Sequence, residues 1–325
     1  MQLAWGYAAP LMIEAGVRHR VFDLLDGSPK TIEEVAAASG ASVRGIRALM
    51  NALAGIQLLA KNADGRFTLT AESAAFLVSA KPGYLGGLIG HTSTPMLPKW
   101  LELSETVRTG KSAIAVNQEG QGAAFFQNFV EDIFPMSYPA AQRLADVLDL
   151  ASAKKPVKVL DLAAGSGVWG IALAQRSPFV SVTAVDWPGV LDVTRRVATR
   201  LGVGERFSFL AGDLASADFG QGHDVATLGH ILHSEGEKRS RAILKKTFNA
   251  LAPGGTIAIA EFLVDDARTA PPMGLIFAVN MLVATEEGDT FSFGEIAAWL
   301  IEAGFENPLT VDSPGPSPLI LAKRP

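Results

Sequence analysis

The chain has 325 residues, of which 48% are hydrophobic and 19% charged, with no cysteine and a net charge of −5. The length predicts two domains, and the composition is typical of a globular protein. The absence of cysteine excludes disulfides, thiolate nucleophiles and thiolate zinc sites, and the negative charge gives no general attraction to nucleic acid or to anionic membranes.

The N-terminal segment is expected to be a packing helix. Residues 1–17 are apolar but include Glu14, and they lack the basic leader and small-residue cleavage site of a signal peptide. The apolar stretch at 271–285 is shorter than the roughly 20 residues that span a bilayer, and it contains Asn280. We therefore expect a cytoplasmic protein that makes no membrane contact and holds no metal.

The next segment shows the order helix, helix, hairpin. Thr31 and Glu34 have the spacing of a capping box, which opens a short helix. Apolar residues then recur at helical spacing over residues 42–59. An Asp-Gly turn separates two β-prone runs at 59–61 and 66–70. This order predicts a mainly α-helical, winged-helix-like domain.

A winged helix suggests either DNA binding or a packing module. Residues 1–80 contain seven basic and seven acidic side chains, so their net charge is zero. A DNA reader is usually clearly basic on its recognition helix. The charge favours a packing or dimerisation role, and no nucleic-acid partner is expected.

A helical connector follows, and then a pattern of short strands alternating with helices. The connector includes a helical run at 123–150, which we expect Pro135 and Pro139 to break. The predicted strands are 157–162, 181–186, 207–210, 224–229 and 256–261, with a closing hairpin at 309–312 and 318–322. This pattern predicts an α/β fold with a Rossmann-like sheet and a C-terminal antiparallel hairpin. We place the N-terminal domain and the start of the connector at 1–110, and the catalytic domain at 111–325.

The first βα turn of this sheet carries a nucleotide-binding motif. Asp161 ends a strand, Gly165 and Gly167 form a loop that enters a helix, and Asp186 ends the next strand, where a carboxylate can accept hydrogen bonds from a ribose. The same glycines and Gly170 fit the dinucleotide pattern G-x-G-x-x-G, so an NAD-dependent oxidoreductase is an alternative.

Three features favour S-adenosylmethionine over NAD. The Asp161 carboxylate would repel a pyrophosphate but not a sulfonium cofactor with a positively charged amino-acid end. After the third strand, Asp213 can accept from an adenine amino group while Leu214 covers the ring. The closing hairpin is characteristic of the methyltransferase variant of this sheet.

From about residue 10 to its end, the chain resembles the small-molecule S-adenosylmethionine-dependent O-methyltransferases related to plant caffeate, hydroxyindole and bacterial polyketide methyltransferases. The matching positions are Asp161-Leu-Ala-Ala-Gly-Ser-Gly167, Asp186, Gly212-Asp213, His230-Ile-Leu-His233, the run 243–255 and Glu261. The resemblance implies a homodimer formed through the N-terminal domain. It also implies that Asp186 holds the ribose, Asp213 the adenine, and the glycine loop with Asp161 the methionine end. Trp187, next to Asp186, is also expected to bind the cofactor.

The same resemblance makes His233 the general base that removes the proton of the acceptor hydroxyl, with Glu261 orienting it. A second family carboxylate falls, by spacing, near Gly288, so its role is either shifted to Glu287 or missing from this chain. His230 is interpreted as a structural residue. The family usually has Asp and Trp after the base, where this chain has Ser234 and Glu235.

The acceptor is expected to be a small, aromatic molecule. Met136, Phe277 and Met281 lie where relatives build the acceptor pocket, with plain core packing as the equal alternative. The sequence thus predicts O-methylation of a small-molecule hydroxyl. N- or C-methylation and repurposed chemistry remain the main alternatives, because the neighbours of His233 are altered.

Overall fold

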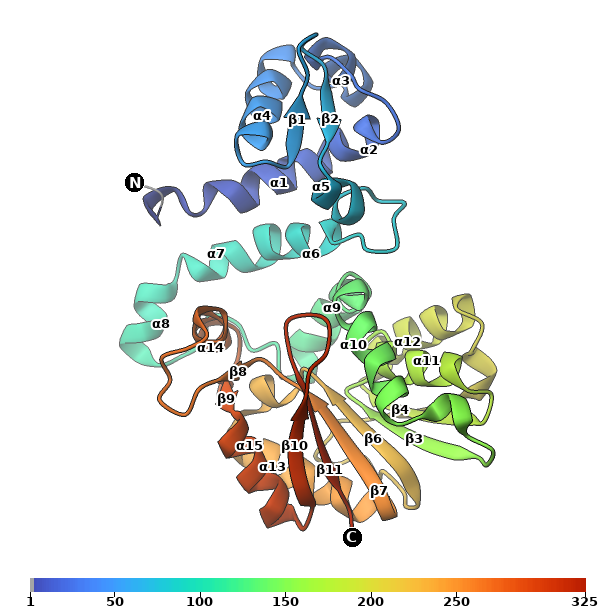
Figure 1. Cartoon of the computed structure of the whole chain (residues 1–325). Helices are drawn as coiled ribbons and strands as arrows, with labels where there is room; N and C mark the ends of the chain where they lie inside the picture. Colours follow the sequence, from blue (N-terminus) through green and yellow to red (C-terminus); the bar gives the residue numbers. More distant parts are fainter. Residues whose placement is uncertain (1–2) are drawn as a thin grey trace. The chain divides into compact units, whose positions relative to one another are not determined.

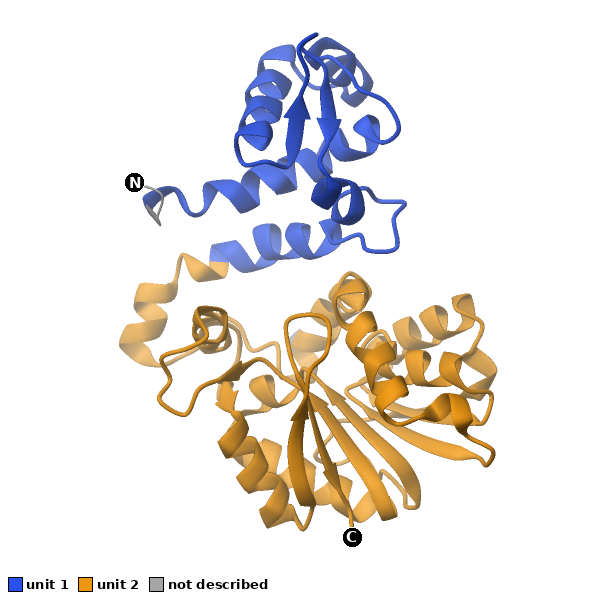
Figure 2. Ribbon diagram, viewed as in Figure 1, with its two compact units in different colours: residues 1–98 blue, residues 99–325 orange. Residues whose placement is uncertain are grey.

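The computed structural model describes residues 3–325, so the first two residues of the expected N-terminal domain lie outside it. The chain forms two compact units, residues 1–98 and 99–325 (Figure 2). The predicted boundary lies near residue 110. The structure instead assigns α8 (Leu103–Thr109) to the second unit, and α7 (Leu97–Trp100) runs across the division.

The first unit is mainly α-helical and has one short hairpin. Its elements are η1 (Leu3–Trp5), α1 (Ala8–Arg18), α2 (Val21–Leu25), α3 (Ile32–Ser39), α4 (Val43–Gly55), β1 (Leu59–Lys61), β2 (Phe67–Leu69), α5 (Ala71–Phe76), α6 (Gly86–His91) and the π-helical η2 (Thr92–Met96). The expected order of helix, helix and hairpin is confirmed in α3, α4 and the antiparallel β1–β2 pair.

Local signals explain these elements. The Thr31 side chain accepts from the Glu34 N–H while Glu34 reaches back to the Thr31 N–H, so both halves of the predicted capping box form. The buried side chains of α4, Ile46, Met50 and Leu53, recur at helical spacing and join the core of this unit.

The second unit begins with helices that lead to the sheet. They are α8, α9 (Glu119–Phe129), α10 (Phe134–Val147) and η3 (Leu150–Ser152). The helical run breaks between α9 and α10, just before Pro135, whose place in the first turn of α10 requires no N–H donor. The expected break at Pro139 is wrong, because α10 continues through that residue.

A seven-stranded sheet forms the centre of this unit, with strand order β10-β11-β7-β6-β3-β4-β5 (Figure 1). The β3, β4, β5, β6 and β7 strands are parallel, and β11 pairs antiparallel with β7 and β10, which confirms the closing hairpin. The strands are β3 (Val157–Leu162), β4 (Val180–Asp186), β5 (Phe207–Ala211), β6 (His223–Gly229), β7 (Leu251–Ala260), β10 (Glu306–Val311) and β11 (Leu319–Lys323).

Helices cover both faces of the sheet. With α10, the helices α11 (Val168–Arg176) and α12 (Pro188–Arg200) cover one face, and α13 (Leu232–Ala250) and α15 (Phe293–Ala303) cover the other. A short η4 (Gly204–Arg206) precedes β5, and α14 (Pro272–Ala284) lies beside a small β8–β9 pair (Leu263–Val264 and Phe291–Ser292). Val159 packs with α10, α11 and α12, whereas its neighbour Leu160 packs with α13 and α15. The alternation of side chains along β3 thus joins two cores into a three-layer α/β/α unit.

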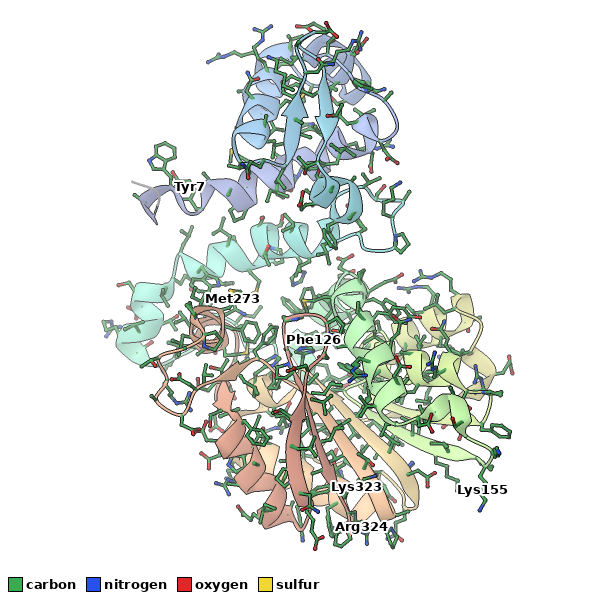
Figure 3. All side chains as sticks on the ribbon, in the orientation of Figure 1. Tyr7, Phe126, Lys155, Met273, Lys323 and Arg324 are labelled. Carbon is green, nitrogen blue, oxygen red and sulfur yellow. The ribbon has the colours of Figure 1, made fainter. Side chains whose placement is uncertain are left out.

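Because parallel strands all end at the same edge of a sheet, this topology gathers the residues that follow β3, β4, β5, β6 and β7. The glycine loop, Asp186, Asp213, His233 and Glu261 all follow or end these strands. In Figure 3, Phe126 of α9 and Met273 of α14 lie toward this edge, and Lys323 and Arg324 lie at the opposite end.

Candidate active site

The loop between β3 and α11 rests on a buried carboxylate. Asp161 is fully buried; its Oδ1 accepts a hydrogen bond from Thr227 Oγ1 at 2.7 Å, and its Oδ2 accepts one from the Gly170 N–H at 3.0 Å. Burial raises the pKa of Asp161 to about 7. Gly165 and Gly167 follow with φ angles of 57° and 79°, which glycine adopts without strain. Asp161 therefore ties the first turn of α11 to β6 from inside the fold, with both of its oxygens engaged.

Asp186, at the end of β4, is tied to the same loop. Its Oδ2 accepts from the Gly165 N–H at 2.9 Å and its Oδ1 from the Trp187 N–H at 2.7 Å. Burial raises the pKa of Asp186 to about 6. The Trp187 ring is half-buried against Phe126 of α9, with 6.2 Å between the ring centroids. The structure thus brings the predicted ribose carboxylate and the glycine loop together.

Asp213, the third predicted cofactor carboxylate, follows β5, and the backbone just before it lies close to the backbone of Asp186. The Gly212 N–H donates to the Asp186 carbonyl at 3.0 Å. Asp213 Oδ1 accepts from the Ala215 N–H at 2.8 Å, and both of its oxygens accept from Arg239 of α13. Leu214 is buried, with 6% of its surface exposed, and joins the sheet core.

The expected base and its orienting carboxylate form a direct pair. His233 Nδ1 lies 2.6 Å from Glu261 Oε1, and the His233 N–H donates to Glu261 Oε2 at 3.1 Å. The Phe262 N–H also donates to Oε1. Burial alone would raise the pKa of Glu261, but the contacts with His233 outweigh it and hold that pKa below its usual value. An ionised Glu261 accepts from Nδ1–H, which leaves the Nε2 lone pair of His233 available for a proton.

Aromatic rings enclose the His233 imidazole. The Phe277 ring of α14 meets it edge-on at 4.9 Å between centroids, and Phe262 lies 6.1 Å from it. Phe262 and Phe277 are themselves 4.3 Å apart. The His233 side chain is only 11% exposed. Such rings exclude water from the neighbourhood of His233.

His230 belongs to the same aromatic group. Its ring lies 5.0 Å from Phe262 and 6.5 Å from Trp169, and its Nε2 lies 2.9 Å from Ser317 Oγ in the turn between β10 and β11. Its φ is +59°, an uncommon conformation for a residue with a side chain. Burial lowers the pKa of His230 to about 4. His230 is therefore neutral and anchors the closing hairpin to the end of β6.

Glu287 lies beside the base through its backbone. Its side chain is exposed, while a Cβ at Gly236 would come within 2.5 Å of its carbonyl oxygen. The Asp289 N–H donates to the His233 carbonyl at 2.9 Å, and a Cβ at Gly288 would lie 2.5 Å from that carbonyl oxygen. The loop between α14 and β9 is thus packed, backbone to backbone, on residues 233–236.

The predicted acceptor residues lie on two helices. Phe277 contacts the base, Met281 on the same helix is buried, and Met273 is 65% exposed. Met136 of α10 is half-buried, and its carbonyl oxygen is 3.2 Å from the Cβ position of Gly315 in the β10–β11 turn. The structure places the Phe277 ring directly at His233, whereas the backbone of Met136 approaches the closing hairpin.

Four residues of this region were missed in the sequence. Glu235 and Arg239 form an ion pair in α13. Their spacing of four residues is the signal in the sequence that could have predicted this pair, because such residues are neighbours on a helix. Phe262 and Ser317 reach the site through contacts distant in sequence. Among the described residues, no group of three metal-ligating side chains could hold a metal ion, and no helix within residues 3–325 is long and apolar enough to span a membrane.

Two family models match the chain. An O-methyltransferase domain matches residues 100–306, and an O-methyltransferase dimerisation domain matches residues 1–79. The chain is 31% identical to a 3-hydroxy-5-methyl-1-naphthoate 3-O-methyltransferase of Streptomyces sahachiroi, over 96% of this chain and 91% of that protein. It is 26% identical to a tetracenomycin 8-O-methyl transferase of Streptomyces glaucescens, over 100% and 96% of the two chains. An L-tyrosine C(3)-methyltransferase of Streptomyces lavendulae is 25% identical, over 97% and 90%.

Solved structures have the same fold. A protein of Nostoc punctiforme PCC 73102, described as a candidate O-methyltransferase, superposes with a TM-score of 0.90 at 29% identity, over 99% of this chain and 97% of that one. The structure of PigF with S-adenosylhomocysteine gives a TM-score of 0.85 at 25% identity, over 99% and 97%; PigF comes from a Serratia strain.

Proposed function

The chain belongs to the O-methyltransferase family, and from that premise we propose that His233 is the base with which it methylates a hydroxyl of a small aromatic molecule. The enzyme is S-adenosylmethionine-dependent. The observation that carries the assignment of the base is the 2.6 Å contact between His233 Nδ1 and Glu261 Oε1, which fixes the ring and leaves Nε2 free.

The residues after β3, β4 and β5 suit this cofactor. Asp186 uses one lone pair of each oxygen on backbone N–H groups, so lone pairs remain for the two ribose hydroxyls. Asp213 would accept from the adenine amino group. The positive φ angles at Gly165 and Gly167 let the loop backbone approach the methionine end. Membership of the O-methyltransferase family, and not the charge of Asp161, argues against NAD, because Asp161 is fully buried and its pKa is raised to about 7.

When bound, the cofactor supplies a methyl group activated by a positively charged sulfur. His233 Nε2 would remove the hydroxyl proton as the acceptor oxygen bonds to that methyl carbon and the carbon–sulfur bond breaks, which releases S-adenosylhomocysteine. Glu261 holds the imidazole in orientation and stabilises its positive charge after proton transfer. Phe262 and Phe277 keep water from the base and would stack against a flat acceptor.

We propose Phe277, Met281 and Met136 as acceptor-binding residues. Phe277 has the strongest support, because its ring contacts the base. The first relatives methylate a hydroxynaphthoate and a tetracenomycin intermediate according to their names, and fused aromatic rings of that kind match the apolar surroundings of His233. We also propose Glu287 as a second carboxylate near the acceptor. Its side chain is exposed in this structure.

The test compares His233→Ala with the wild type, using S-adenosylmethionine and a set of hydroxynaphthoates. Wild-type enzyme should give products heavier by one methylene, and His233→Ala should lower turnover by about 10²–10⁴-fold while binding the cofactor normally. Glu261→Gln should cost less, because an amide still holds the ring but offers no charge.

His223→Ala is the matched control. His223 is a buried histidine at the opposite end of β6, where its Nε2 lies 2.9 Å from the Phe219 carbonyl oxygen. It should change stability without the large loss of turnover. Wild-type turnover in His233→Ala would end the proposed mechanism and leave proximity as the catalytic device.

Transfer to a ring carbon is the second candidate, because one relative is named as a C-methyltransferase. Removal of a phenol proton by His233 would activate the ring carbon next to the hydroxyl as well as the oxygen. The ¹³C chemical shift of the transferred methyl group separates the two products, because a methyl on oxygen resonates far downfield of a methyl on carbon.

A further inference from the structure

A chain of charged side chains connects the candidate adenine site with the helix that carries the base. The two Asp213 oxygens accept from Arg239 Nη2 at 3.2 and 3.1 Å. The Nε of the same guanidinium donates to Glu235 Oε2. Glu235 is two residues beyond His233, so Arg239 joins the end of β5 to the first turn of α13.

The burial of the Glu235 carboxylate costs free energy of folding, because a charged group loses its hydration when it is buried. Glu235 is 5% exposed, and burial raises its pKa despite the pairing with Arg239. Gly236, between the two partners, has φ 71° and ψ 169°, so the helix is kinked where the pair forms. The Arg239 side chain is 39% exposed, so the pair has one buried partner, Glu235, whose loss of hydration an ion pair repays only in part. The network therefore calls for a role beyond stability.

The Asp213 side chain has two restraints. One is the Ala215 N–H, which reaches Oδ1 only, and the other is the Arg239 guanidinium, which reaches both oxygens. Without Arg239, the carboxylate keeps a single tether on Oδ1 and could turn about it. A fixed acceptor loses less conformational freedom when it binds a ligand than a mobile one does.

We propose that Arg239 is a positioning residue that fixes Asp213 as the acceptor for the 6-amino group of the cofactor adenine, with Glu235 holding Arg239 in place. This inference rests on the proposed role of Asp213. It predicts that Arg239 controls recognition of the 6-aminopurine, and with it the KM for S-adenosylmethionine, rather than the chemical step. Two lone-pair positions per carboxylate oxygen leave room for the adenine donor beside the guanidinium.

The test measures discrimination between two ligands by calorimetry on the intact protein. One is S-adenosylhomocysteine, and the other is its analogue with hydrogen in place of the 6-amino group. Wild-type protein should prefer the amino compound by about tenfold, as expected for a hydrogen bond to a charged group. Arg239→Gln should reduce this preference to about twofold and raise the KM for S-adenosylmethionine, with kcat changed much less.

Arg239→Lys and Arg241→Gln complete the design. A lysine is a single point charge that cannot reach both carboxylates with the geometry of a guanidinium, so it should restore only part of the preference, and it replaces the glutamine variant if that one fails to fold. Arg241 lies on the same helix and pairs at the surface with Glu237 and Glu302. Its glutamine variant should keep the wild-type preference.

The outcomes separate this inference from the proposed cofactor site. If Asp213→Ala removes the preference but Arg239→Gln and Arg239→Lys both keep it, Asp213 binds the adenine and the role of Arg239 is refuted. If Asp213→Ala keeps the wild-type preference, the assignment of Asp213 fails and the role of Arg239 fails with it. Equal weakening of both ligands in Arg239→Gln shows a general structural role and also overturns the proposal.

Discussion

In the catalytic unit, Asp161 and Glu261 are fully buried and Asp186 is half-buried, and their hydrogen-bond partners give these three carboxylates different protonation behaviour. Asp161 and Asp186 receive hydrogen bonds from neutral groups only. These bonds lower the pKa of each carboxylate less than burial raises it, so the pKa values rise to about 7 and about 6. For Glu261, contact with His233 outweighs burial and lowers the pKa. The carboxylate beside the candidate base is therefore the one that stays ionised, as a partner for an imidazolium must.

The raised pKa of Asp161 predicts a pH dependence of stability. Between the ordinary value of 3.8 and about 7, the unfolded protein loses the Asp161 proton while the folded protein keeps it. The free energy of unfolding of the wild type should therefore fall as pH rises through this window, relative to Asp161→Asn, by about 1 kcal/mol per pH unit. Denaturant titrations of both proteins at pH values between 4 and 8 measure this difference, which should level off above about 7. A difference that grows with pH would contradict the burial argument.

The elements around the cofactor edge pack so closely that single glycines control their approach. In α9, a Cβ at Gly122 would lie 2.0 Å from the Val116 carbonyl oxygen and 2.6 Å from the Trp187 ring. Trp187 directly follows Asp186 and precedes α12. The position of α9 is thus coupled to the carboxylate proposed to bind the ribose.

Gly122→Ala should force α9 away from Trp187. We expect a loss of about 1–3 kcal/mol in stability, as for other overpacked sites, and weaker binding of S-adenosylhomocysteine. Gly120→Ala, in the same helix, meets no atom within 4 Å and should instead stabilise the protein by about 0.5–1 kcal/mol through helix propensity. Thermal unfolding and calorimetry test the pair, and equal effects of the two substitutions would refute the close-packing argument.

The molecule as a whole consists of two compact units, and the first matches a dimerisation domain over residues 1–79. That unit exposes large apolar side chains at its start. Trp5 is 62% exposed and Tyr7 56% exposed, and their rings stack with centroids 6.2 Å apart. Figure 3 labels Tyr7 near the start of α1. Exposed aromatic side chains in contact with one another are typical of an interaction surface.

We expect the intact protein to be a homodimer at micromolar concentration. Trp5→Glu combined with Tyr7→Glu should shift it toward the monomer, because two charges would be buried at the interface. Phe179→Glu serves as the control, since Phe179 is an exposed aromatic residue of the catalytic unit. Light scattering decides the matter: a monomeric wild type, or a double variant as dimeric as the wild type, would exclude this surface.

Local patterns made most of the fold predictable. The alternation of apolar strands and helices located β3 to β7, and the glycine loop with its flanking carboxylates located the cofactor edge. The direction of the Asp161 side chain could not be read, because a central strand covered on both faces shows no polar alternation. The pairing of Arg239 with Asp213 joins residues 26 apart, and the Ser317 contact with His230 spans 87. Only the assembled sheet brings such groups together.

The backbone contacts between the α14–β9 loop and the residues around His233 determine which positions can vary during evolution and which cannot. The loop holds the His233 carbonyl through the Asp289 N–H, and the close approaches at Gly236 and Gly288 involve main-chain atoms. Side chains along α14 can therefore be exchanged during evolution, for a different acceptor, without disturbing the attachment of the base. The two glycines have no such freedom. A lineage that diversifies its substrates on this scaffold would vary α14 while keeping Gly236 and Gly288 unchanged.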